Sequence, residues 1–376
     1  MDFTVSPTDG IHALLVAGAA VPTAAKPPVG LPGCPTKCGK VTVPYPFGIR
    51  AGCSLPGFEL TCDRTRNPPK LLLDDGAGGR LEVTNISLPD VTVRVVGSAV
   101  LNLTATASGE ANTTWQAPFR HKQLLVVPPQ QLFLSYHHNS FFSVGCNLRL
   151  TLHGGTGSGE LVTGCSTSCS PEHLRMRFAF SGGRCFRCLG VGCCKMPTAF
   201  IYPSFDVRLK ALDPAHEVAS PPTRNLVLIG DQHWIGKSWC KMIIDAKPSN
   251  GRRRKRRPVQ RDLSRVPMTL EWAMDSEPYQ GAVAADNASR CPTDHATSLC
   301  KSKHSLCKDR YSPLLSGYAC QCSSGYHGNP YLTDGCQDID ECANPEHYGC
   351  YGKCTNMLGT YSNADVHEVL TEIHPS

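Results

Sequence analysis

The sequence predicts a mainly β, disulfide-rich fold: a β-sandwich-like region followed by small crosslinked modules. The first observation is composition, because 21 cysteines, 34 glycines and 30 prolines among 376 residues indicate a loop-rich chain held by many disulfides. The second is a series of short runs in which apolar and polar residues alternate. The third is a change at Cys291, after which the cysteines follow one another at the short intervals of small modules.

The alternating runs predict β-strands, because successive side chains of a strand point to opposite faces. Glycine and proline separate the runs, and few stretches have a helical period. This pattern favours an all-β sandwich or a barrel-like body over an α/β fold. The runs are 40–43, 58–62, 81–84, 91–96, 124–127, 141–144, 148–152, 175–180, 205–209, 226–229 and 268–272.

The cysteine content predicts a secreted or extracellular protein, because disulfides persist in oxidising compartments. Four N-glycosylation sequons agree with this location. They begin at Asn85, Asn102, Asn112 and Asn287.

Residues 1–25 form a signal-like segment, whose part from Ile11 to Ala25 has the apolar body and small-residue end of a signal peptide. Asp2 and Asp9 stand where a basic residue is usual. No apolar run approaches the roughly 20 residues needed to cross a bilayer, so the sequence predicts no membrane span.

The formal net charge of +6 is concentrated in Arg252, Arg253, Arg254 and the basic residues that follow, within an expected exposed loop at 246–265. Three interpretations stay open: a solvated loop, a patch that attracts an anionic polymer, and a nuclear signal. The third conflicts with the sequons and disulfides, so no nucleic-acid partner is expected.

A dense cysteine cluster lies in the middle of the chain. Adjacent cysteines cannot easily pair with each other, so Cys193 and Cys194 are expected to reach different partners. A zinc or redox cluster is the alternative, and structural disulfides are favoured in a secreted chain. No nucleophile and base can be paired from the sequence, and no catalytic residue is assigned. The cluster comprises Cys165, Cys169, Cys185, Cys188, Cys193 and Cys194.

Six cysteines from Cys291 to Cys336, with a C-x-C at the fourth and fifth positions and Gly-Tyr-His-Gly shortly after it, resemble an EGF-like module at 289–337. Sequence alone leaves many pairings of six cysteines open. The resemblance implies the pairs Cys291–Cys307, Cys300–Cys320 and Cys322–Cys336.

The segment 34–62 carries a second resemblance, in Cys-Pro-Thr-Lys-Cys-Gly, Pro-Tyr-Pro-Phe-Gly-Ile and Phe-Glu-Leu-Thr-Cys. With the downstream Gly-Val-Gly-Cys-Cys and the EGF pair, the chain resembles the extracellular part of the plant wall-associated receptor kinases. The galacturonan-binding region is then expected at 26–288, with its core motif at 34–62 and a second part from about residue 165.

The resemblance implies non-catalytic binding of pectin (homogalacturonan) at the plant cell wall, with cell-wall proteins as further partners. Polygalacturonate carries a carboxylate on each sugar, so lysine and arginine are the expected binders and aromatic rings the expected stacking partners. For Tyr45 and Phe47 a packed turn is the alternative. The candidates are Lys37, Lys40, Tyr45, Phe47, Arg50, Arg64, Arg66, Lys70, Arg252, Arg253 and Arg254.

The sequence contains no Gly-rich loop with a strand lysine, no His-Arg-Asp and no Asp-Phe-Gly of a kinase. Two alternatives to pectin binding therefore stay open. One is a truncated gene model of a full receptor serine/threonine kinase. The other is an EGF-type protein-interaction ectodomain that binds no carbohydrate.

A calcium-binding EGF-like module is expected at 338–361, because its acidic lead-in offers the oxygen ligands that Ca²⁺ prefers. A solvated acidic turn is the alternative. The family pattern implies Asp338, the Ile339 carbonyl, Glu341 and Asn356 as ligands.

The same module lacks two cysteines of the family pattern, because Asn363 and Asp365 stand at their positions. Cys342–Cys354 is the expected pair, which leaves Cys350 without a partner. The family pattern therefore stops at Tyr361, and 362–376 is interpreted as a non-family tail.

Overall fold

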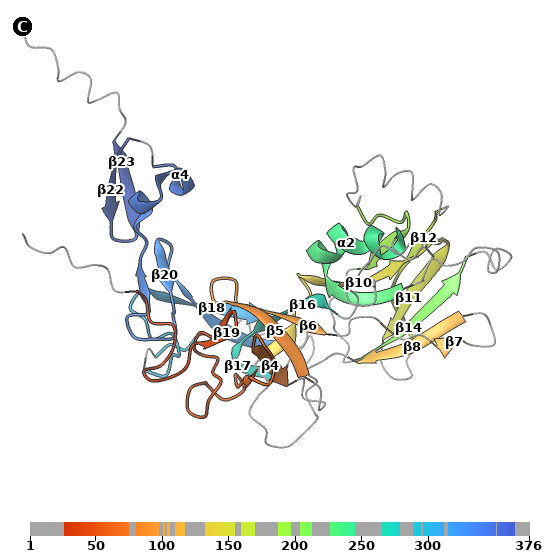
Figure 1. Ribbon diagram of the computed structural model, residues 1–376, viewed down its shortest axis with the longest axis horizontal. Helices are drawn as coiled ribbons and strands as arrows, with labels where there is room; N and C mark the ends of the chain where they lie inside the picture. The colour runs from red at the N-terminus through yellow and green to blue at the C-terminus, as the bar shows by residue number, and fades with distance from the viewer. Residues whose placement is uncertain are drawn as a thin grey trace, which may run out of the picture.

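The chain folds into a mainly β, disulfide-rich structure, as predicted (Figure 1). This computed structural model describes residues 26–74, 80–97, 101, 104–105, 110–116, 132–154, 159–169, 187–196, 204–212, 226–244, 265–278, 289–294, 296–311, 315–350 and 352–364. The predicted strands at 124–127 and 175–180 lie outside these residues.

The first lobe is built on a six-stranded antiparallel sheet of order β3-β4-β5-β6-β16-β9. Alternation places Leu71, Val83, Val93 and Val95 on its buried face. Strand β16 comes from far along the chain, and Leu270 joins the same core opposite Val93. The strands are β3 (Thr61–Asp63), β4 (Lys70–Asp74), β5 (Arg80–Ser87), β6 (Thr92–Gly97), β9 (Leu132–Leu134) and β16 (Val266–Trp272).

The second lobe packs a five-stranded sheet, β12-β11-β14-β8-β7, against a three-stranded one, β13-β10-β15. Phe141 on β10 makes edge contacts with Trp115 on β8 and Phe205 on β14, at ring-centroid distances of 5.1 and 5.8 Å, so the sheets face each other as in a sandwich. Helix α2 (Gln232–Ile244) follows β15. The strands are β7 (Thr104–Ala105), β8 (Glu110–Gln116), β10 (Asn139–Val144), β11 (Leu148–Gly154), β12 (Leu161–Thr167), β13 (Cys193–Met196), β14 (Ser204–Ala211) and β15 (Leu226–Asp231).

Buried and partly buried polar contacts join the two lobes. The Asn139 side chain donates to the Thr269 carbonyl at 2.7 Å and accepts from the Thr269 amide at 3.0 Å. Arg94 of the first lobe donates to the Asp231 carboxylate at 2.8 Å. Groups buried away from water need such partners, so these bonds fix how the lobes meet.

The first small module, residues 289–338, has a three-stranded sheet of its own, of order β17-β19-β18, and shares its core with the first lobe. Strand β17 (Met274–Pro278), which precedes its first cysteine, pairs with β19 (Leu315–Cys322), and β19 pairs with β18 (Ser305–Tyr311). A further hairpin joins β20 (Tyr326–Gly328) to β21 (Cys336–Asp338). The hydroxyl of buried Tyr331 accepts hydrogen bonds from Trp272 Nε1 at 3.1 Å and the Cys320 amide at 3.2 Å. Burial raises the pKa of Tyr331 to about 12.

The second small module, residues 339–364, stands at the end of the molecule away from the second lobe (Figure 1). It consists of η3 (Glu341–Ala343), α4 (Pro345–Tyr348) and the hairpin of β22 (Lys353–Met357) and β23 (Thr360–Ala364). The hairpin turn rests on the first small module, because a Cβ at Gly325 would overlap the Gly359 carbonyl. No helix among the described residues is both long and apolar enough to cross a bilayer.

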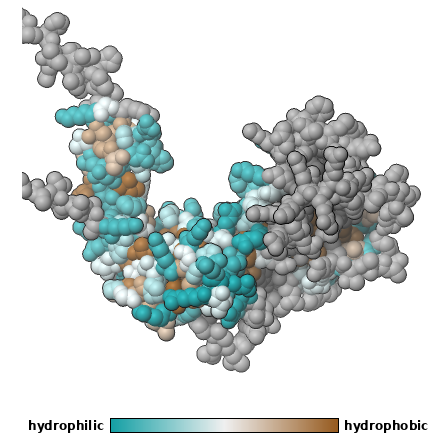
Figure 2. Space-filling view, in the orientation of Figure 1, coloured by the Kyte–Doolittle hydropathy of each residue, from teal (hydrophilic) through white to brown (hydrophobic). Residues whose placement is uncertain are grey.

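Hydrophilic side chains cover most of the described surface of the first lobe and the small modules in the view of Figure 2. The hairpin of β1 (Lys37–Cys38) and β2 (Val41–Thr42) lies beside this lobe's sheet, and two disulfides, Cys34–Cys53 and Cys38–Cys62, hold it there.

Candidate functional site

The Pro-Tyr-Pro-Phe-Gly motif of the N-terminal segment is part of the core. Phe47 is 1% exposed and makes edge contacts with Phe58 at 5.0 Å and Trp272 at 5.2 Å. A ring enclosed in this way cannot stack on a sugar, so Phe47 is removed from the candidate binding residues. The packed turn, the alternative stated for this residue, is what the structure shows.

Tyr45 is half-buried, and burial raises its pKa. Its carbonyl, together with that of Val29, accepts hydrogen bonds from the Asn329 side chain at 2.8 and 3.0 Å. The motif therefore holds the first small module against the first lobe, which is a structural role that the motif alone did not indicate.

The β1–β2 hairpin is held tightly against the loop that precedes β4. Gly39 in its turn has φ +57°, and a Cβ there would overlap the Pro69 carbonyl, so only glycine allows this approach. The disulfide between Cys38 and Cys62 ties the same hairpin to β3. The hairpin and the 63–69 loop consequently meet at one edge of the lobe.

Four exposed basic side chains belong to the hairpin and to the 63–69 loop, and we call Lys37, Lys40, Arg64 and Arg66 the basic edge. Among the described residues, the first three make no ion pair. Arg66 is 68% exposed and lies 3.8 Å from the Asp63 carboxylate, a separation at which a surface pair contributes little. The basic edge therefore offers positive charge that internal carboxylates leave mostly uncompensated.

Two other predicted binders are engaged within the protein. The Lys70 ammonium lies 2.6 Å from the Glu82 carboxylate, which Arg265 also approaches at 3.4 Å. Burial pulls the pKa of Glu82 upward, but the two cations hold it below its usual value. Arg50 donates to the Gly33 carbonyl at 2.7 Å and stays exposed. The sequence analysis did not identify Glu82 as a partner of these cations. The only sequence signal for it is that it is a polar residue in an alternating strand.

Two of the predicted calcium ligands, Asp338 and Asn356, meet where the β22–β23 hairpin approaches the first small module. The Asp338 carboxylate accepts from the Asn356 side chain at 2.9 Å and from the Gly359 amide at 2.5 Å. Asp340 instead caps η3 by accepting from the Cys342 and Ala343 amides.

Glu341 is 4% exposed, and its Oε2 has no hydrogen-bond partner among the described residues. A buried carboxylate oxygen without a partner carries a large desolvation cost. A hard cation bound to this oxygen would offset the cost, and Asp338, Asn356 and the Ile339 carbonyl also offer the oxygen ligands that Ca²⁺ prefers, so the residue types present fit Ca²⁺.

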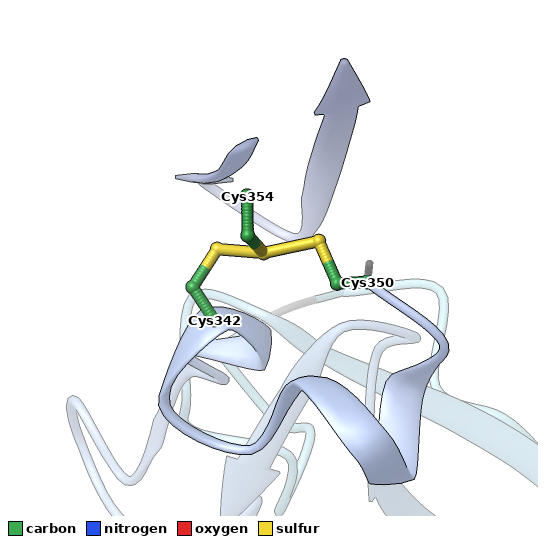
Figure 3. Close-up of side chains that lie close together, drawn as sticks. All are labelled: Cys342, Cys350 and Cys354. Carbon is green, nitrogen blue, oxygen red and sulfur yellow. A yellow bond between two sulfur atoms is a disulfide. The ribbon is translucent and has the colours of Figure 1, made fainter. Parts of the chain in front are cut away.

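The first small module contains the three disulfides that the EGF resemblance implies, Cys291–Cys307, Cys300–Cys320 and Cys322–Cys336. In the second, Cys354 lies within bonding distance of both Cys342 and Cys350 (Figure 3). Cys350 is thus not isolated from the other sulfurs, contrary to the expectation that it has no partner.

In the central cluster, Cys193 and Cys194 reach different partners, as expected: Cys188–Cys193 and Cys165–Cys194 are disulfides. Cys146 pairs with Cys169. These sulfurs are held in disulfides, so they do not form the alternative zinc or redox cluster. Cys185 lies outside the described residues.

The sequon asparagines Asn85 and Asn112 are exposed, as attachment of a glycan requires. Glycosylation itself stays a prediction. Asn102, Asn287 and the basic residues Arg252, Arg253 and Arg254 lie outside the described residues.

Residues 34–97 match the family described as wall-associated receptor kinase galacturonan-binding. The chain is 26% identical to wall-associated receptor kinase 5 of Arabidopsis thaliana over 87% of its own length and 38% of that protein. It is 29% identical to wall-associated receptor kinase 3 of the same plant, over 84% of this chain and 37% of that protein. It thus spans less than two fifths of the length of these relatives. No solved structure is significantly similar to the chain.

Proposed function

We propose that this chain, which is similar to the wall-associated receptor kinases and matches the model of their galacturonan-binding domain, is a non-catalytic, extracellular module that binds pectin. The match of residues 34–97 to that domain carries the proposal. The expected location is the plant cell wall, where the relatives' name places them.

The chemistry of the basic edge supports the proposal. A galacturonan chain presents carboxylates at regular intervals, and a row of exposed cations gains from each of them. Lys37, Lys40 and Arg64 form no ion pair with a described carboxylate, whereas Lys70 and Arg265 both lie against Glu82. We infer that the polymer runs along the hairpin and the 63–69 loop and contacts these three side chains first.

The test is retention of the full chain on immobilised polygalacturonate. The variant Lys37→Ala, Lys40→Ala, Arg64→Ala is expected to bind about tenfold more weakly, because three exposed charge contacts of about 0.5 kcal/mol each amount to roughly 1.5 kcal/mol. Retention of the unmodified chain is expected to fall with salt, since exposed charges are screened.

A matched control removes three exposed cations elsewhere, with Arg149→Ala, Arg208→Ala and Lys303→Ala, and is expected to bind as the unmodified chain does. Equal losses in both variants would show non-specific attraction and would contradict the basic edge as the site. Absence of any retention would favour a protein-interaction ectodomain. The exposed Met357 and Leu358, at 45% and 82%, support that second candidate.

We propose in addition that Ca²⁺ binds between the small modules, held by Asp338, the Ile339 carbonyl, Glu341 and Asn356. The orphaned Glu341 oxygen and the contact of Asp338 with Asn356 support this site. The role of this ion would be structural, because it would hold the β22–β23 hairpin on the first small module. Added Ca²⁺ is then expected to stabilise the second small module.

A further inference from the structure

Three cysteines of the second small module bring their sulfur atoms together. Cys342 lies on η3, Cys350 follows α4, and Cys354 lies on β22. The three Sγ atoms are within 4.8 Å of one another. The Cα atoms of Cys354 and Cys342 are 5.5 Å apart, and those of Cys354 and Cys350 are 5.7 Å apart. Both separations are ordinary for a disulfide.

Only one of the two disulfides can exist in a given molecule, because a cysteine sulfur forms a single S–S bond. Cys354 therefore pairs either with Cys342 or with Cys350, and the remaining cysteine is a thiol. Figure 3 shows the Cys354 sulfur between the other two. The backbone is compatible with both pairings, so neither requires the module to refold.

Comparison of the two small modules explains why a third sulfur gathers here. In the first, Cys307 lies directly opposite Cys320, which pairs with Cys300. In the second, Cys354 takes the place of Cys307, but the residue opposite it is Asn363. Cys350 corresponds to Cys300 of the first module, whose disulfide partner is Cys320. Because Asn363 stands in the position of Cys320, Cys350 has no such partner, and its nearest sulfur is that of Cys354.

The two pairings leave thiols of different accessibility. When Cys342–Cys354 forms, the thiol is Cys350, which is 2% exposed and lies 3.9 Å from the Ser362 carbonyl. When Cys350–Cys354 forms, the thiol is Cys342, which is partly exposed. Since reagents reach the thiol only when it is accessible, the choice of partner for Cys354 decides whether this module can react.

We propose that Cys342, Cys350 and Cys354 form a thiol–disulfide exchange site that presents one reactive thiol, at Cys342, to a disulfide-bearing partner. In the internal step Cys350 loses its proton, and its thiolate attacks Cys354 Sγ. The Cys342–Cys354 bond breaks as the Cys350–Cys354 bond forms, and Cys342 leaves as a thiolate that takes up a proton. No net oxidation or reduction occurs.

In the external step the Cys342 thiolate attacks one sulfur of the partner's disulfide. A mixed disulfide forms, and the partner's other sulfur leaves as a thiolate and is protonated. A small disulfide such as glutathione disulfide can serve as the probe. A second chain or a protein with an exchangeable disulfide would react by the same chemistry, and size separation of the products distinguishes them.

The test compares two labelling protocols with N-ethylmaleimide on the full chain, followed by peptide mass spectrometry. In the first, the protein is acid-quenched, unfolded and labelled, and both Cys342 and Cys350 are expected to carry label in different molecules. In the second, the folded protein is labelled slowly, and the label is expected to accumulate at Cys342 as exchange restores its thiol. Glutathione disulfide is expected to add one glutathione at Cys342.

Three variants fix the pairing. Cys350→Ser leaves only Cys342–Cys354, and Cys342→Ser leaves only Cys350–Cys354, so neither is expected to label within this cluster. Asn363→Cys supplies the residue opposite Cys354 that Cys350 lacks, and it is expected to abolish labelling by restoring the arrangement of the first small module.

Label confined to one and the same cysteine in both protocols would overturn the proposal, because it would show a static disulfide. Three labelled cysteines in the folded chain would also overturn it, and protection of all three by added Zn²⁺ would identify a thiolate metal site instead. Persistent labelling of Cys350→Ser would show that Cys342 and Cys354 do not pair, which is equally incompatible with exchange.

Discussion

Glu82 determines which cations of the first lobe remain available to a partner. Its carboxylate accepts from Lys70 at 2.6 Å and lies 3.4 Å from Arg265, so it compensates charge beside the basic edge without reaching it. Lys70 and Lys40 are the same residue type, but Lys70 has the Glu82 carboxylate beside it and Lys40 has no described ion-pair partner. At this scale the proposed binding surface depends as much on the carboxylates that neutralise some cations as on the cations themselves.

The pKa of Glu82 gives a pH dependence with a definite sign. The pKa is lowered in the folded protein, so the carboxylate contributes stability above its unfolded pKa, near 4.5, and that stability is lost as pH falls through the folded value. Glu82→Gln is therefore expected to lower the free energy of unfolding by roughly 0.5–1 kcal/mol at neutral pH. The difference from the unmodified chain should shrink below about pH 4.5 in denaturant titrations.

Lys70→Met provides the control for this prediction. Removing Lys70 and Glu82 together is expected to cost less than the sum of the single losses, because both remove one interaction. A stability difference for Glu82→Gln that persists unchanged at acidic pH would contradict the ion pair as its cause.

At the scale of elements, the β22–β23 hairpin depends on the contact of Gly359 with Asp338 and Gly325. The hairpin is a two-stranded unit, and such units have little stability of their own in water. A cation between the hairpin and the acidic segment would therefore add a large share of the second small module's stability.

Calcium is expected to protect that module. At a Ca²⁺ concentration of about 100 times the dissociation constant, binding adds about 2.7 kcal/mol to the folded state, which limited proteolysis of the 339–364 segment can detect. A chelator should reverse the protection, and Glu341→Gln should remove it. The exposed Glu346 of α4 supplies the matched control, since Glu346→Gln should keep the calcium effect. Protection that is the same with and without calcium would exclude the site.

At the scale of the whole molecule, the first small module is joined to the first lobe as part of one core. Tyr318, Ala319, Cys320 and Tyr331 belong to the same buried cluster as Phe47. Strand β17 extends the connection, because it continues from β16 of the lobe and pairs with β19 of the module. We expect the lobe and this module to unfold together.

Tyr331→Phe tests this coupling. The change leaves Trp272 Nε1 and the Cys320 amide buried without their acceptor, which is expected to cost about 1–3 kcal/mol of the free energy of unfolding. Tyr326→Phe is the control, because the Tyr326 hydroxyl makes no hydrogen bond to the described residues; its effect should stay within about 0.5 kcal/mol. Separate transitions for lobe and module in the unmodified chain would contradict a shared core.

The residue types of the candidate site could be read from the sequence. Which of them lie close together, and which are buried, could not. The charge of Lys37, Lys40, Arg64 and Arg66 is a property of residue type, so the sequence supplies it. That these four share an edge depends on Gly39 meeting Pro69, a contact between segments about 30 residues apart. The burial of Phe47 depends on Trp272, and no local pattern reports such a partner.

The sequence by itself determined the β-rich, disulfide-rich class, because alternation and cysteine content are local properties that act through backbone geometry and disulfide chemistry. The tertiary structure alone decided that the first small module shares the lobe's core, that Glu82 neutralises Lys70, and that Cys354 faces two sulfurs. Each of these results from contacts between distant segments, whose register is set by packing the whole chain and not by any one stretch of it.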